Sequence, residues 1–174
     1  YRGRDWFYFG NELLEHKRFE EALEKYNKCL NTPETWNIER LNAALRSSLI
    51  YKDKQNYDKA LELAYIAASC TSRPRADVCC VIGDIYRTIK NFEWAKRWYE
   101  GALDNNVSGL DATFYDEDCA SWKPRLNLCL CEYELGNKKK AIRYNNEVLR
   151  IDPNNKDALN NKKILERSEE HTSE

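Results

Sequence analysis

The chain has 174 residues, enough for one domain with a sizeable buried core, and its 28 Lys and Arg against 29 Asp and Glu leave a formal charge of −1. This balance excludes the net positive field that holds nucleic acid or an anionic membrane, so any partner has to be recognised locally. With 33% charged residues, only 6 Gly and 4 Pro, and an apolar stretch at 61–70 that Glu62 interrupts, the composition favours an all-α globular fold without a membrane span.

Hydrophobic periodicity predicts nine helices along the chain. Pro74 and Pro124 lie where the first turn of a helix tolerates proline, and the Asp152-Pro153-Asn154 string ends a helix. The expected helices span 5–16, 19–31, 37–53, 57–70, 75–88, 92–104, 124–135, 138–150 and 155–167.

Small residues recur with the period of one helical hairpin. Ala22, Ala60 and Ala95 are 38 and 35 residues apart, and a weaker copy at Ala141 follows 46 residues later. The small residues that lie twelve positions before these alanines are Gly10, Ser48, Gly83 and Cys129. Small side chains let two helices approach closely, and neighbouring hairpins cover the face that a lone hairpin exposes. The pattern therefore predicts stacked helical hairpins.

The first unit resembles the tetratricopeptide repeat through Trp6, Phe9, Gly10, Leu13, Ala22, Tyr26, Cys29 and Pro33. The resemblance covers about residues 5–153 and implies an α-solenoid of about four hairpins with a C-terminal capping helix. The repeats are expected at 5–34, 37–72, 75–105 and 123–153, and the cap at 155–166. The fourth unit departs from the pattern at Glu132, Lys138 and Asn145, and we expect these polar residues to face solvent in a terminal repeat.

Three stretches fall outside the hairpin pattern. The loop 105–123 has no helical stripe, and loops of this length inside compact domains are often functional. Its apolar residues Phe114 and Trp122 are expected to pin it over the groove end between the third and fourth repeats. Residues 167–174 resemble the translation of a sequencing adapter and are expected to be a non-native tail, while the start at Tyr1 without any Met indicates a piece of a longer protein.

A narrower resemblance extends over most of the chain. The strings TPETWNIERLNAAL, RPRADVCCVIGDIYR, WAKRWYEGAL, ASWKPRLNLCLCEYELG and DPNNKDALNNKKILE look like the helical-repeat region that follows the catalytic domain in bacterial family-2 glycosyltransferases. Those enzymes use an α/β nucleotide-sugar domain with an Asp-x-Asp metal motif, and nothing of that half is present. The resemblance implies a scaffold that supports or targets a sugar-transferring domain of the same polypeptide.

Residues that carry chemistry are sparse, so the sequence predicts no enzyme, metal or cofactor. The cysteines form no CxxC pair and favour packed thiols in a reducing cytoplasm; they lie at 29, 70, 79, 80, 119, 129 and 131. A general base is missing because the histidines are His16, at a helix end, and His171, in the suspected tail. Asp116-x-Asp118 matches a metal motif only superficially, since it lies in a loop between helices.

Stacked hairpins create a concave groove lined by the first helix of each unit. The candidate groove residues alternate polar and apolar side chains: Phe7, Asn11, Asn42, Leu45, Leu49, Asp84, Arg87, Leu130 and Tyr133. Asn amides can hold a peptide backbone at both ends, so the groove suits an extended peptide. Asn11, Asn42 and Arg87 are expected to be solvent-accessible without supporting the core. Some chaperone-binding repeat domains hold a C-terminal carboxylate with a set of basic residues. This chain lacks that set, because Phe7 and Cys80 occupy positions where a cation is needed.

Three functions stay open at this point. The first is the non-catalytic scaffold attached to a glycosyltransferase, in which the groove binds a peptide or packs on the upstream catalytic domain. The second is a catalytic chain that uses the acidic loop around Asp116. The third is a free-standing adaptor or peptide-binding regulator.

Overall fold

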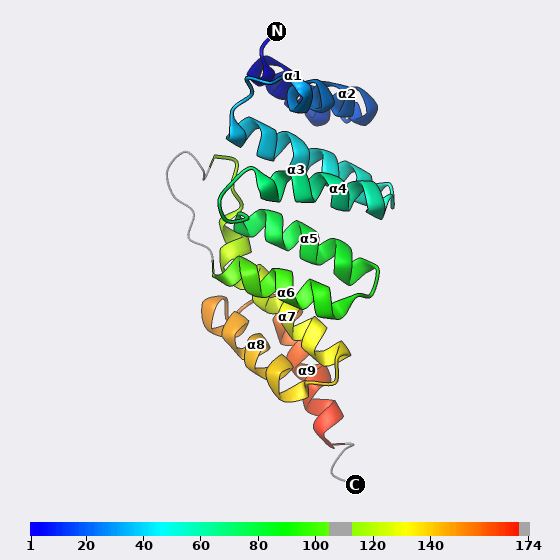
Figure 1. Cartoon of the computed structure of the whole chain (residues 1–174). Helices are drawn as coiled ribbons and strands as arrows, with labels where there is room; N and C mark the ends of the chain where they lie inside the picture. The colour runs from blue at the N-terminus through cyan, green and yellow to red at the C-terminus, as the bar shows by residue number, and fades with distance from the viewer. Residues whose placement is uncertain (105–112, 171–174) are drawn as a thin grey trace.

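The computed structural model describes residues 1–104 and 113–170, and the described part is all-helical, as the sequence predicts (Figure 1). The α-helices of this part are α1 (Gly3–Glu15), α2 (Phe19–Asn31), α3 (Asn37–Asp53), α4 (Tyr57–Ser69), α5 (Ala76–Thr88), α6 (Phe92–Leu103), α7 (Trp122–Glu134), α8 (Lys138–Ile151) and α9 (Lys156–Glu170). A short 3-10 helix, η2 (Glu117–Ala120), precedes α7.

The helices pack as consecutive pairs, α1 with α2, α3 with α4, α5 with α6 and α7 with α8, and α9 packs on α8. The first helix of each pair also contacts the first helix of the next: α1 meets α3, α3 meets α5 and α5 meets α7. These four helices form an inner layer, and the second helices form an outer layer. Figure 1 shows the pairs stacked in one column, with α1 near one end and α9 at the other.

The same turn closes all four hairpins. One residue of each turn has a left-handed backbone conformation, and these residues are Lys17, Gln55, Lys90 and Gly136. The next backbone N–H donates to the carbonyl five residues back, as from Arg18 to Leu13 at 2.9 Å. Each turn lies five positions before a repeat alanine, so it follows the spacing of the sequence repeat.

Small residues lie where the helices of a hairpin come closest. Ala22, Ala60 and Ala95 are fully buried, which confirms the prediction for them. A Cβ atom added at Gly10 or Gly83 would lie 2.6 or 2.7 Å from the ring of Tyr26 or Tyr99. The rings therefore occupy the space that these two glycines leave open.

The fourth hairpin corrects one expectation, because Glu132 and Asn145 do not face solvent. Each is 1% exposed. Lys96 of α6 forms an ion pair with Glu132 at 2.8 Å, and the Asn137 amide donates to the same carboxylate at 2.6 Å. Burial works to raise the pKa of Glu132, but the Lys96 ammonium and the Asn137 hydrogen bond hold it below its usual value. The Asn145 amide donates to the Ala158 carbonyl of α9 at 2.9 Å.

Two departures from the expected helix boundaries concern the predicted loop and the predicted cap. Helix α7 begins at Trp122, inside the predicted loop, and η2 lies just before it. Residues 105–112 of that loop lie outside the described part of the chain. Helix α9 continues to Glu170, so it runs past residue 166, where the cap was expected to end.

Candidate functional site on the inner face

The polar candidates of α1 and α5 support the core of their own hairpins. The hydroxyl of buried Tyr26 donates to the Asn11 amide oxygen at 2.9 Å, and the Tyr99 hydroxyl donates to Asp84 at 2.5 Å. Arg87 donates to the Tyr99 oxygen at 3.3 Å. The expectation that Asn11 and Arg87 are independent of the core is therefore wrong, because both hold the hydroxyl of a ring that packs on a glycine. The expectation that Asn42 is solvent-accessible is also wrong, because Asn42 is 2% exposed.

The apolar candidates are scattered between core and surface. Leu45 belongs to the core that α3 shares with α4 and α5, whereas Leu49 and Tyr133 are exposed and Leu130 is half-buried. Phe7 is buried on the inner face. The structure therefore does not bring the nine predicted residues into one site.

The structure does place a different set of side chains around residues 113–116, which we call the groove segment. The Thr113 carbonyl accepts hydrogen bonds from Arg75 at 3.1 Å and from the Asn42 amide at 3.4 Å. Arg75 in turn forms a two-pronged ion pair with Asp77 at 2.7 and 2.6 Å and donates to the Asn42 side-chain oxygen at 3.1 Å. Asn42, Arg75 and Asp77 are buried, and we call them the polar clamp.

The next residue of the groove segment contacts an aromatic ring and a guanidinium. The Phe114 ring lies edge-on to the Phe7 ring, with centroids 5.6 Å apart. The Arg46 guanidinium lies 5.3 Å from the Phe114 centroid and 5.7 Å from that of Phe7. Phe7 and Arg46 form what we call the aromatic subsite, in which ring and cation attract one another. Its place on α1 and α3 corrects the expectation that Phe114 lies between the third and fourth repeats.

The chain leaves the inner face along α5 and α7. The Tyr115 ring lies 5.6 Å from the Arg75 guanidinium, and its burial, together with nearby Asp77, raises its pKa to about 12. Asp116 pairs with Lys123 of α7 at 2.5 Å. The Cys80 thiol donates to the Cys119 carbonyl of η2 at 3.6 Å, and Cys119 and burial raise the pKa of Cys80. Residues 113–119 thus contact the first helices of all four repeats.

Six of the seven cysteines are packed in the interior, and Asp116 of the acidic loop pairs with Lys123. All seven thiols are free; Cys70 is half-buried and the others are buried. Within residues 1–104 and 113–170, His, Cys, Asp and Glu side chains form no group that could hold a metal ion. His16 lies exposed at the C-terminal end of α1.

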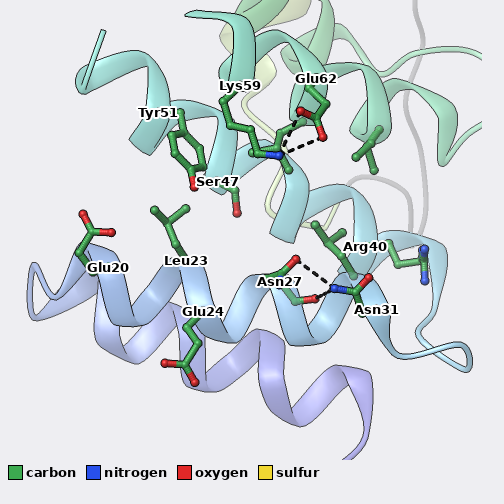
Figure 2. Close-up of a pocket in the computed structure, with 13 residues that line it drawn as sticks. Glu20, Leu23, Glu24, Asn27, Asn31, Arg40, Ser47, Tyr51, Lys59 and Glu62 are labelled. Carbon is green, nitrogen blue, oxygen red and sulfur yellow. Dashed lines mark hydrogen bonds and ion pairs between the residues drawn. The ribbon is translucent and has the colours of Figure 1, made fainter. Parts of the chain in front are cut away.

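A crevice of about 700 Å³ opens on the outer layer between α2 and α4, above α3 (Figure 2). Apolar and polar side chains both line it, and two pairs of the polar ones bond to each other. Lys59 pairs with Glu62 at 3.0 Å, and the Asn31 amide donates to the Asn27 side chain at 3.0 Å. Sequence reasoning did not predict this crevice.

Two important inner-face residues were also missed by sequence reasoning. Arg46 lies four positions after Asn42, so the helical period that selected Asn42 could have found it. Arg75 caps the start of α5, where no helical face is defined, and no sequence signal pointed to its role. The contact with Thr113 depends on a loop whose course periodicity does not predict.

Stacked helical hairpins with an inner layer of first helices define an α-solenoid. A family model described as tetratricopeptide repeat matches residues 76–106. The chain therefore contains a tetratricopeptide repeat there, and its described part has the fold of a tetratricopeptide solenoid.

Solved structures agree on this fold. YrrB, a TPR protein with an unusual peptide-binding site, is 18% identical over 95% of this chain and 76% of its own, with a TM-score of 0.72. MamA is 17% identical over 98% of this chain and 88% of its own, with a TM-score of 0.71. PilF of Pseudomonas aeruginosa is 16% identical over 91% of this chain and 65% of its own, with a TM-score of 0.69. A comparison with curated protein sequences gave no match.

A search of the described residues for membrane spans found no helix with the length and apolar character to cross a bilayer.

Proposed function

We propose that this chain is a non-catalytic protein-interaction scaffold whose inner face binds an extended peptide segment of a partner protein. The observation that carries the proposal is the polar clamp on the Thr113 carbonyl, beside the aromatic subsite. Together they hold one backbone carbonyl and the aromatic side chain of the next residue, which are the two elements of peptide recognition: backbone bonds for affinity and a side-chain pocket for specificity.

The hydrogen-bond donors of the polar clamp are held in a fixed orientation by their own bonds. Asp77 and Asn42 orient the Arg75 guanidinium from two repeats, so little side-chain entropy remains to be lost when a carbonyl binds. YrrB, which has the same fold, is described as having an unusual peptide-binding site, which is consistent with peptide binding as a use of this fold. The packed thiols and paired acidic groups support a scaffold rather than an enzyme.

The proposal includes a parent protein. We infer that the scaffold is the C-terminal part of a bacterial family-2 glycosyltransferase in the cytoplasm, on the strength of the five sequence strings and the free thiols. A free-standing adaptor is the alternative. Reading the coding sequence upstream of Tyr1 separates them: a nucleotide-sugar domain with an Asp-x-Asp motif supports the first, and a nearby start codon supports the second.

Peptide selection tests the binding itself. The target is a variant in which the groove segment, residues 113–116, is replaced by Gly-Ser-Gly-Ser, and the ligands are displayed random 12-residue peptides. We expect recovered peptides that share an aromatic residue and bind at least tenfold more weakly when Asn42→Ala is added to the target. A folded target that enriches no peptide, or peptides indifferent to Asn42→Ala, would contradict the proposed function.

A further inference from the structure

We propose that the groove segment acts as a ligand in cis: it occupies the peptide site of the inner face and has to leave before a partner's aromatic peptide can bind. This inference rests on the proposed function and adds the identity of the occupant and the chemistry of its competitor. The competing ligand is an extended peptide with one aromatic side chain, placed one residue after the carbonyl that the polar clamp holds.

The first argument is that the contacts of the groove segment are those of a bound peptide. Asn42 and Arg75 bind a backbone carbonyl, which every residue type has, rather than a side chain that only Thr113 could supply. Phe7 and Arg46 bind an aromatic ring through its edge and face. A peptide from another protein also has backbone carbonyls and can carry an aromatic ring, so the chemistry of these contacts is not specific to this chain's own segment.

The second argument is that the segment is bound under strain and incompletely covered. Phe114 has a φ of +59°, a left-handed conformation that non-glycine residues seldom adopt, and its side chain is 48% exposed. A free peptide is not tied to α6 and α7 and can place its aromatic residue without this backbone conformation. Such a peptide can therefore compete with a segment that has the advantage of being in the same chain.

The third argument is that the occupied contacts join separate repeats. The aromatic subsite takes Phe7 from α1 and Arg46 from α3, and the polar clamp joins α3 to the start of α5. Whatever occupies the site therefore bridges three repeats. In this chain residues 113–114 make the bridge. Thr113 lies 38 positions after Arg75 and 71 positions after Asn42 in the sequence.

A labelled peptide with the sequence of residues 113–118, Thr-Phe-Tyr-Asp-Glu-Asp, tests the inference by fluorescence anisotropy. Three chains are compared: the unaltered chain, the Gly-Ser-Gly-Ser replacement, and Phe114→Gly, which removes the ring and tolerates the positive φ. We expect the replacement to bind the peptide at least tenfold more tightly than the unaltered chain, with Phe114→Gly in between, because an occupied site lowers the apparent affinity.

Two controls make the result specific. A peptide with Ala in place of Phe is expected to lose at least tenfold in affinity for the replacement chain. Ile164→Ala removes a comparably exposed apolar side chain on α9 and is expected to leave the affinity of the unaltered chain unchanged. Circular dichroism of each chain checks that it is helical, and Phe114→Gly serves alone if the longer replacement does not fold.

The outcomes separate this inference from the proposed function. Equal affinity of the peptide for all three chains would overturn the in-cis occupancy and leave peptide binding intact. Failure of the peptide to bind the replacement chain, when selected random peptides do bind it, would also overturn the occupancy, because the segment would then not resemble a ligand. If neither the labelled peptide nor any selected peptide binds, the proposed function itself fails.

Discussion

The third and fourth hairpins differ in the side chains that pack between their two helices. In the third, Gly83 of α5 leaves room for the Tyr99 ring of α6, and the ring hydroxyl bonds to Asp84. In the fourth, Cys129 takes the glycine position and packs with Ala141 and Leu165, while Asn145 takes the tyrosine position and donates to the Ala158 carbonyl. The glycine–tyrosine contact of the third hairpin lies within that hairpin, whereas the buried Glu132 and Asn145 of the fourth have partners from α6 and α9.

This difference shows how a repeat can lose its pattern and keep its place in the array. Glu132 and Asn145 look unsuitable for a core, yet each is buried with a specific partner supplied by a neighbouring element. Burying such groups costs free energy that only their bonds offset. The third hairpin should therefore respond most to changes of volume, and the fourth to changes of charge.

The largest effect is expected from Gly83→Val. The new side chain begins 2.7 Å from the Tyr99 ring, and either the ring or the helix has to move, at a cost of about 3 kcal/mol in the free energy of unfolding. Gly101→Val is the matched control, because among the described residues a Cβ there meets only the Cys79 sulfur, at 3.9 Å. Urea unfolding followed by circular dichroism measures both; an equal response at the two positions would contradict the close packing assigned to Gly83.

A smaller loss is expected from Lys96→Met, which leaves the buried Glu132 carboxylate without its cation. Breaking a fully buried ion pair costs about 3–5 kcal/mol, and because Lys96 reaches solvent we expect about 2 kcal/mol here. Adding Glu132→Leu should restore part of the stability. The control is Lys59→Met, which removes an exposed pair with Glu62 and should cost less than about 1 kcal/mol. Similar losses for both lysines would show that burial of Glu132 does not matter.

The smallest effect is a change in the acid dependence of stability. The pKa of Glu132 is lowered in the folded chain, so the unfolded chain binds more protons, and the stabilisation is present above the ordinary value of 4.5 and is lost as the pH falls below it. Between about pH 6 and pH 3, the melting temperature should fall less steeply with decreasing pH for Glu132→Gln than for the unaltered chain. If the melting temperatures of the two chains fall in parallel, other carboxylates account for the loss of stability in acid.

The candidate site was predictable only where it lies on a helical face. Phe7 and Asn42 were recognised because helical period places them on the inner side of α1 and α3. Asn11 and Arg87 share that face, but their hydrogen bonds to Tyr26 and Tyr99 turn them into supports of the core. Periodicity states which side a residue faces and does not state which neighbour it bonds to.

The sequence by itself determined the hairpins, the stack and the burial of Ala22, Ala60 and Ala95, because these depend on local spacing that repeats along the chain. Tertiary structure alone decided which groups fill the inner face and the fourth hairpin. Asn42 meets the Thr113 carbonyl across 71 positions, and Lys96 meets Glu132 from a different repeat. Such contacts are selected by the fit of partners in three dimensions, and no period in the sequence encodes them.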